Sequence, residues 1–256
     1  MKTESIKIEP HWVLSKEFIW ESQFAQLQDS ANSRFCTKKI LQIASAVAAT
    51  LLLALLIPAF YTNTIDVAFG EHKSIELPDG SKVDINAGSS LSYKPLLWKV
   101  SRKVQLEGEA YFEVAKGSAF TVNSKAASVL VLGTSFNVYA RESFRATCFS
   151  GQVEVFNLAQ SVILSPNMQA SFDGAQLESH NISTALQTIG WKSKQFSFDA
   201  VPLSSVIAEI ERQYNIKVLI PKKIDYLYTG NFTKLDDPKQ VLEILGKPFG
   251  IILKIE

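Results

Sequence analysis

Residues 75–93 have the sequence IELPDGSKVDINAGSSLSY. Short runs in this stretch alternate apolar with polar side chains and are bounded by turn residues, which is typical of β strands. The pair Asp79-Gly80 lies between two of these runs, and an Asp-Gly pair tolerates the positive φ angles that a tight hairpin turn requires. The stretch therefore predicts a β hairpin.

The same pattern continues on both sides of the hairpin, from Asp66 to about Phe172. Strands are predicted at VQLEG, AYFEVA, FTVNS, VLVLG, FNVYA, ATCFSG, VEVFN and QASF, with a turn residue after nearly every one. We therefore expect an all-β domain at residues 66–180, built as a sandwich, a jelly roll or a short β-solenoid.

A different pattern begins near Trp191 and defines a predicted domain at residues 190–256. Helical spacing appears in LSSVIAEIERQY, which follows Pro202 and ends before Asn215. A second helix is predicted after Asp237-Pro238, an N-cap residue followed by proline, and Gly246 then supplies a stop. Strands are predicted at residues 196–198, IKVLIP and IILKIE, and a linking hairpin or loop at residues 226–235. This order predicts a small α/β domain of two βαβ units.

Residues 40–61, ILQIASAVAATLLLALLIPAFY, contain no charged side chain. A helix of this length spans a hydrocarbon core of about 30 Å, whereas a buried core helix is usually shorter and a signal peptide has a shorter apolar region. Arg34, Lys38 and Lys39 precede the segment, and Lys73 is the only Lys or Arg in the twenty residues after it. The positive-inside rule therefore predicts a single-pass membrane protein with a cytoplasmic N-terminus and an extracytoplasmic C-terminal part.

The charge balance excludes a nucleic-acid-binding surface of the usual kind. The chain has 26 Lys and Arg against 25 Asp and Glu, a formal net charge of +1, whereas phosphate binding needs an excess or cluster of cations. Cys36 and Cys148 fall on opposite sides of the predicted membrane helix, so they predict no disulfide. We expect a protein or a small molecule as partner.

No catalytic or cofactor site is predicted. The three histidines lie in separate regions without a metal-ligand spacing, and the segment around Ser135 lacks the second glycine of a nucleophile elbow. Glu107 and Glu109 share one side of an extended chain, as a glycosidase pair would, but such a pair beside a turn is more typical of a solvated face. We therefore predict no enzyme activity, no cofactor and no metal.

The segment at residues 1–39 contains one helical pattern, HWVLSKEFIWESQFAQL at residues 11–27. Val13, Trp20, Phe24 and Leu27 lie near one face of this predicted helix. Two interpretations remain equally open. The helix binds a partner in the cytoplasm, or it lies on the inner leaflet with its tryptophans at the headgroup level.

Four elements together resemble the FecR family of transmembrane anti-sigma regulators, in particular those of the Bacteroidetes type. They are IELPDGSKVDINAGSSLSY, RKVQLEGEAYFEVAK, VLVLGTSFNVYA and SGQVEVF, in the order and spacing of that family over residues 71–172. The last sixty residues resemble the domain that follows in that branch, which is related to the short N-terminal domain of secretins and TonB-dependent receptors. The resemblance implies a periplasmic β domain anchored in the inner membrane.

The resemblance also implies a function. Such proteins relay the state of an outer-membrane TonB-dependent receptor, through its signalling domain, to an extracytoplasmic-function (ECF) sigma factor, often with proteolysis inside the membrane. Phe18, Trp20, Phe24 and Leu27 are then the candidate contacts with the sigma factor, although 39 residues are fewer than relatives use for this purpose. The alternative is a membrane-anchored envelope protein that binds or hydrolyses glycans.

Overall fold

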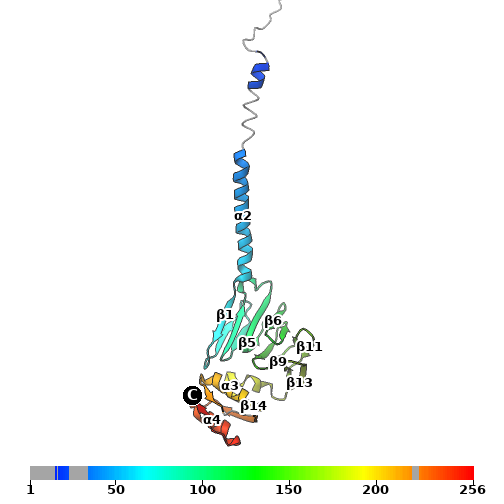
Figure 1. Cartoon of the computed structure of the whole chain (residues 1–256). Helices are drawn as coiled ribbons and strands as arrows, with labels where there is room; N and C mark the ends of the chain where they lie inside the picture. The colour runs from blue at the N-terminus through cyan, green and yellow to red at the C-terminus, as the bar shows by residue number, and fades with distance from the viewer. Residues whose placement is uncertain (1–14, 16, 23–33, 221–224) are drawn as a thin grey trace, which may run out of the picture. The chain divides into compact units, whose positions relative to one another are not determined.

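The computed structural model describes residues 15, 17–22, 34–220 and 225–256. The chain divides into two compact units, Met1–Ile57 and Pro58–Glu256. The second unit contains an all-β domain followed by a smaller module of strands and helices (Figure 1). Each of these parts has a hydrophobic core of its own.

Helix α2 (Arg34–Phe60) contains most of the apolar segment predicted from the sequence. Leu51, Leu52 and Leu53 follow one another and are all exposed, so this part of the helix has no polar side. The hydroxyls of Ser45 and Thr50 donate to main-chain carbonyls of the preceding turn, each at 2.9 Å. Counting only residues whose placement is described, none of the helices combines the length and the apolar character that crossing a membrane requires.

Residues 63–181, all of them described, form thirteen strands, and the long strand β5 (Arg102–Glu113) belongs to both halves of the sheet. The first half of β5 pairs with β4 (Ser89–Tyr93) and β6 (Phe120–Asn123), and its second half pairs with β3 (Lys82–Ile85) and β8 (Ser135–Ala140). The other strands are β1 (Asn63–Val67), β2 (Lys73–Glu76), β7 (Ser128–Val131), β9 (Phe144–Ser150), β10 (Val153–Phe156), β11 (Ser161–Leu164), β12 (Met168–Phe172) and β13 (Leu177–Asn181). The β5–β6 pair is parallel, and the other pairs of this domain are antiparallel.

Gly108 is the point at which β5 passes from one half of the sheet to the other. Its φ of +108° is unfavourable for any residue with a side chain, and a Cβ atom there would lie 2.4 Å from Oγ of Ser89. The sequence predicted two strands ending in a turn at this glycine, which is wrong, because the chain continues through Gly108 as one strand. The predicted hairpin between β2 and β3 is confirmed, with Gly80 at φ +81°.

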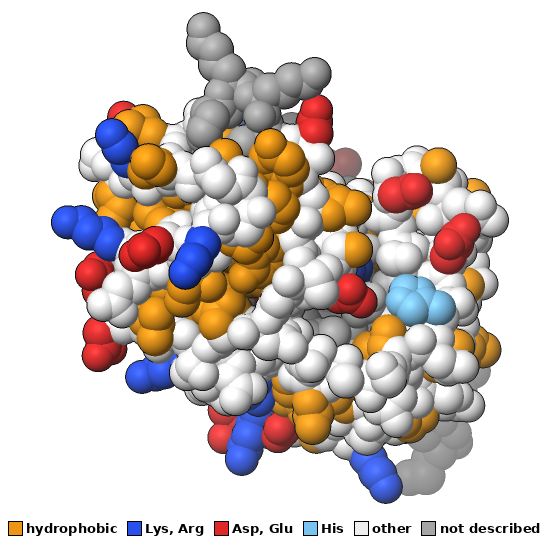
Figure 2. Space-filling view, turned by 90° about the horizontal axis from the view of Figure 1, so that it is seen from below, with side chains coloured by type: hydrophobic (Ala, Val, Ile, Leu, Met, Phe, Trp, Pro, Cys, Tyr) orange, Lys and Arg blue, Asp and Glu red, His pale blue; other side chains and the backbone are white. Residues whose placement is uncertain are grey.

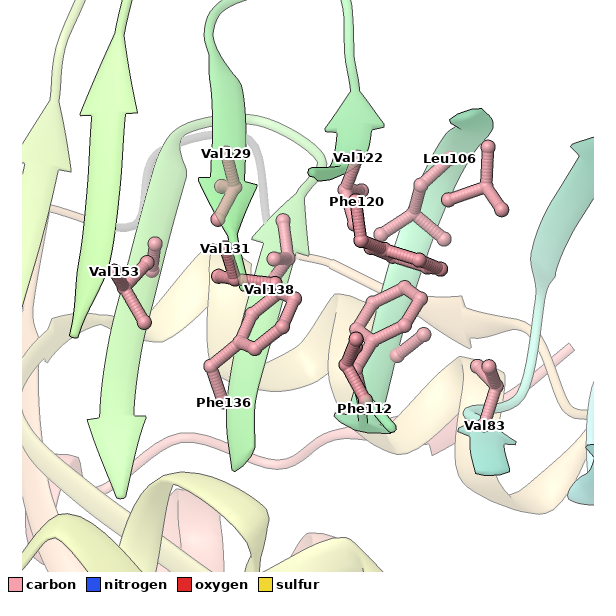
Figure 3. Close-up of a cluster of buried hydrophobic side chains, with 14 of the residues drawn as sticks. Val83, Leu106, Phe112, Phe120, Val122, Val129, Val131, Phe136, Val138 and Val153 are labelled. Atoms are coloured by element: carbon pink, nitrogen blue, oxygen red, sulfur yellow. The ribbon is translucent and has the colours of Figure 1, made fainter. Parts of the chain in front are cut away.

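Side chains from both halves of the sheet meet in one hydrophobic cluster (Figure 3). The ring of Phe112 on β5 stacks on Phe136 of β8 at 5.0 Å between centroids. Phe120, on β6 in the other half, meets Phe112 edge to face at 6.1 Å. The two halves therefore face each other as layers of a nearly closed sheet, and the predicted all-β domain is confirmed.

Residues 195–256 contain the two predicted β-α-β runs, and a single strand stands where a hairpin or loop was expected at residues 226–235. The runs are β14 (Gln195–Pro202), α3 (Leu203–Tyr214) and β15 (Val218–Leu219), then β16 (Leu227–Thr233), α4 (Pro238–Gly246) and β17 (Lys254–Ile255). The strands pair across the two runs: β14 is antiparallel to β16, and β15 is antiparallel to β17. We call this part the C-terminal module.

The start of α4 and the end of α3 are as predicted, but the strand after each helix is shorter than predicted. Asn215 closes α3 with φ +52°, and Oδ1 of Asp237 accepts a hydrogen bond of 2.9 Å from the main chain of Lys239 at the start of α4. The N–H groups of Ile216 and Ile251 then donate back to helix carbonyls. Because these groups close the helix ends, IKVLIP and IILKIE each contribute a strand of two residues.

Candidate functional site

The predicted sigma-factor contacts lie in the first unit, where residues 17–22 are helical. Ser15 caps this helix, because its Oγ accepts a hydrogen bond of 3.2 Å from the N–H of Phe18. The side chains of Phe18 and Trp20 are 59% and 64% exposed. Residues two apart on a helix point in directions about 200° apart, so these two do not share a face. Phe24 and Leu27 lie outside the described residues, and the four-residue contact stays a prediction.

The C-terminal module presents apolar side chains to solvent. Figure 2 shows hydrophobic side chains gathered in a band on the face seen there. Among the described residues of the module, the exposed large apolar side chains are Leu219, Ile220, Tyr226, Leu227, Ile244 and Ile252, and we call them the module's apolar surface. The ring of Tyr226 stacks on Phe249 at 4.6 Å between centroids. A continuous apolar band of this kind is typical of a protein-binding surface.

The two-stranded sheets of the module leave strand edges open. Within residues 34–220 and 225–256, neither sheet has a third strand. A bulge between Phe198 and Val201 interrupts β14, and the N–H of Val218 on β15 donates to the Glu211 carboxylate at 2.7 Å. The outer edge of β17 has no described strand beside it, and the exposed Ile252 lies two residues before this strand. This edge is suited to strand addition by a partner.

Glu109 lies in the interior of the β domain, on β5 directly after Gly108. Its side chain is buried, and its two oxygens accept hydrogen bonds of 2.8 Å from the amides of Asn86 and Asn137. Burial, together with the charge of Glu209, raises the pKa of the Glu109 carboxyl. The sequence placed Glu107 and Glu109 on one solvated face. That is wrong for Glu109, because the positive φ of Gly108 between them turns it into the interior.

Gln213 on α3 links this buried carboxyl to the C-terminal module. Its side-chain amide donates to Oδ1 of Asn86 at 2.6 Å and to Oε1 of Glu209 at 2.9 Å. Its own oxygen is 3.0 Å from Nε2 of His72, which is therefore the donor in that bond. Burial is the main reason that the pKa of His72 is lowered from 6.5, and the charge of Lys234 acts in the same direction. We call Asn86, Glu109, Asn137, Glu209, Gln213 and His72 the junction network.

Charged contacts surround the junction network. Arg212 on α3 forms ion pairs with Glu209 at 2.9 Å and with Glu142 of the β domain at 3.3 Å. The carbonyl of Arg212 accepts a hydrogen bond of 2.7 Å from the N–H of Gly70. Nearby, Arg141 donates to the carbonyls of Ala87 and Gly88 at 2.7 and 2.9 Å. The β domain and α3 are thus joined by directional polar bonds, which fix one arrangement more narrowly than apolar contact would.

The segment between the two parts adds a second set of contacts. It forms the 3-10 helix η2 (Ala185–Ser193). Lys192 pairs with Asp84 at 2.7 Å and lies 3.8 Å from the ring centroid of Tyr111. The ring of Trp191 meets His72 edge to face at 5.4 Å. His72 of the β domain therefore contacts both η2, through Trp191, and α3, through Gln213.

The sequence did not predict the junction network. Glu209, Arg212 and Gln213 have the i, i+3, i+4 spacing of one helix face, which is a signal that could have indicated a polar contact surface on α3. Arg212 and Gln213 are 7% and 1% exposed. The partners of this face, Asn86 and Glu142, are 127 and 70 residues away in sequence, a distance over which spacing carries no information.

The described residues offer little reactive chemistry. They contain no group of three or more His, Cys, Asp or Glu side chains that could hold a metal ion. Ser135 begins β8, and its hydroxyl is 2.7 Å from that of Ser150. Burial raises the pKa of the Cys148 thiol to about 11, which keeps it in the unreactive protonated form. The arrangement is suited to binding and to passing on a change of conformation.

Comparison with known proteins agrees with this geometry. The family model described as FecR protein matches residues 63–154, and the model described as FecR, C-terminal matches residues 195–256. A crystal structure of a candidate anti-sigma factor from Parabacteroides distasonis ATCC 8503 is similar with a TM-score of 0.71 and 30% sequence identity, over 76% of this chain and 98% of that chain. A second one from the same organism has a TM-score of 0.69 and 32% identity, over 75% and 98%. No curated protein matches the chain.

Proposed function

Because the chain belongs to the FecR family, whose members are regulatory and not enzymatic, we propose that it is an anti-sigma regulator of cell-surface signalling. In this proposal it is anchored in the inner membrane by residues 40–61, with a cytoplasmic N-terminus and a periplasmic C-terminal part. It receives the state of an outer-membrane TonB-dependent receptor and passes it to an ECF sigma factor.

The receptor contact is assigned to the C-terminal module. Its apolar surface and the open edge of β17 together support binding of a receptor's signalling domain by strand addition. A strand added beside β17 would lie next to Ile252, whose side chain is 79% exposed. Main-chain hydrogen bonds would supply affinity, and the apolar side chains would select the partner.

The relay is assigned to the junction network, and the bond between Gln213 and Asn86 is the observation that carries the proposal. It connects the helix of the receptor-binding module to a buried carboxyl in the domain that follows the membrane segment. Leaving some polar groups of a buried network without a partner is unfavourable. A partner that shifts α3 would therefore break these bonds together and not one at a time. In this proposal the junction switches between two discrete arrangements, one with these bonds and one without them.

The cytoplasmic contact is assigned to Phe18, Trp20, Phe24 and Leu27, which would hold the sigma factor. Proteolysis within the membrane would release it. The apolar helix has features that support cleavage: Ala44, Ala46, Ala48 and Ala49 are small, and Pro58 removes a main-chain hydrogen bond. The hydroxyl bonds of Ser45 and Thr50 to the preceding turn also weaken a helix locally.

Affinity purification of the tagged full-length protein from cross-linked cells tests this proposal. We expect an ECF sigma factor and a TonB-dependent receptor among the proteins recovered. Trp20→Ser with Phe24→Ser should lose the sigma factor and keep the receptor, whereas Ile252→Asp should do the reverse. Leu158→Ser, an exposed position in the turn between β10 and β11, is the control for both. Recovery of neither partner by the wild-type protein would overturn the proposal.

A further inference from the structure

The loop between β4 and β5 exposes two apolar side chains on a rigid support. Its main chain is tied by hydrogen bonds to the carbonyls of Lys94, Pro95 and Leu97, the last of which accepts from two N–H groups. Trp98 is buried, with its ring edge to face against Tyr93 at 5.4 Å and Phe120 at 5.9 Å. Leu96 and Val100, two residues to either side, are 58% and 88% exposed. The buried tryptophan therefore holds these two side chains outward.

The same loop is uniformly basic. Residues 85–106 contain no Asp or Glu, and their charged side chains are Lys94, Lys99, Arg102 and Lys103. Arg102 is buried and paired with Asp79, whereas Lys99 and Lys103 are exposed. Exposed cations beside exposed apolar residues match the two layers of a bilayer surface, which are anionic headgroups and the acyl boundary beneath them.

The loop lies where the chain passes from α2 into the β domain. Asn63, the first residue of β1, is in register with Tyr93 at the end of β4, and its amide donates to the Tyr93 hydroxyl at 3.1 Å. A surface cavity of about 340 Å³ is lined by Thr62 together with Lys94, Leu97 and Lys103. Phe60, the last residue of α2, is three residues before Asn63, a span of about 10 Å when fully extended. A helix in the membrane would therefore keep this loop near the headgroups.

We propose that the loop at residues 94–103 rests on the outer surface of the inner membrane and binds anionic phospholipid. Val100 and Leu96 enter the interface, and Lys99 and Lys103 contact headgroup phosphates. This inference rests on the proposed function, since it requires residues 40–61 to span the bilayer. The rigid loop loses little conformational entropy on binding, which favours a stable contact. The contact would fix the orientation of the β domain, and with it the direction in which the module faces the receptor.

Fluorescent probes on the full-length protein test the proposal. An environment-sensitive dye is attached at Val100→Cys in a Cys36→Ser background, where the buried Cys148 is retained. The protein is placed in nanodiscs of phosphatidylcholine, alone or mixed with phosphatidylglycerol, and quenched with nitroxide lipids or with aqueous iodide. We expect lipid quenching and several-fold protection from iodide in the anionic discs, and both should fall with Lys99→Gln and Lys103→Gln.

Two reference probes separate the outcomes. Ile252→Cys, exposed on the C-terminal module, should remain open to iodide in every disc. Val47→Cys reports whether the apolar helix is in the bilayer. The loop contact would be wrong if iodide quenched the Val100 probe as strongly as the Ile252 probe while the Val47 probe stayed shielded. That result would still support the membrane anchor. Equal shielding in both lipids would overturn the assignment to anionic headgroups, and an open Val47 probe would overturn the anchor and the loop contact together.

Discussion

The side chain of Gln213 donates a hydrogen bond of 2.6 Å to Asn86, although 127 residues separate them. Asn86 also donates to the buried Glu109 at 2.8 Å, and Gln213 contacts both His72 and Glu209. One amide on α3 thus bonds to an asparagine, a histidine and a glutamate at the same time. Any partner that moves α3 must change this set of bonds.

Replacing Gln213 with alanine should loosen the C-terminal module from the β domain. The change leaves the buried side-chain oxygen of Asn86 without its Gln213 donor, at a cost of about 1–3 kcal/mol, and it also removes the acceptor of His72. Hydrogen exchange should become faster in α3 and around residue 86, and the melting temperature should fall. Gln240→Ala, an exposed glutamine on α4, is the matched control. Equal exchange in the two variants would show that the bond does not hold the module.

The junction should weaken on mild acidification because of His72. Its folded pKa lies below the ordinary value of 6.5, so the folded state binds this proton less tightly than the unfolded state. The stabilisation is complete above pH 6.5 and is lost as the pH falls through the lowered pKa. The groups facing His72 are Gln213, Lys234, Glu209 and Asn86. Melting temperatures of the wild type and His72→Gln, measured from pH 7.5 downward, should diverge below pH 6.5.

Protonation of Glu109 changes the stability of the folded protein in the opposite direction to protonation of His72. Its raised pKa means that the folded state holds the proton more tightly, so stability increases as the pH falls from that pKa toward the ordinary 4.5. His72→Gln retains this contribution and should therefore become relatively more stable in acid. If the two proteins kept parallel profiles, His72 would not control the junction.

The sequence predicted those elements whose signals lie within a few residues. The cap at Asp237, the end of α3 at Asn215 and the hairpin at Asp79-Gly80 depend on local main-chain chemistry, and all three are present. The corner at Gly108 could not be predicted, because a glycine after a strand also suits a turn, and Ser89 from a distant strand decides the outcome. The junction network was missed for the same reason, since its bonds join segments far apart in sequence.

Substitution of Gly108 by alanine should destabilise the β domain strongly. The residue would have to keep φ +108° and its Cβ would lie 2.4 Å from Oγ of Ser89, so strain and a clash add up to about 2 kcal/mol or more. Gly80→Ala is the matched control, because Gly80 also has a positive φ of +81° but has no atom within 4 Å of the new Cβ. Its cost should be about 1 kcal/mol. Chemical denaturation of both variants gives the comparison, and equal losses would contradict the corner.

The thiol of Cys148 should report on unfolding of the β domain. It is buried on β9, and burial raises its pKa to about 11, so both access and thiolate formation are suppressed in the folded protein. In a Cys36→Ser background, the thiol should react with an aromatic disulfide reagent at pH 8 only as fast as the domain opens. Adding denaturant through the unfolding transition should then increase the rate by orders of magnitude. Rapid labelling without denaturant would show that the sheet around β9 opens locally. It would also mean that Cys148 cannot be retained when fluorescent dyes are attached at other cysteines.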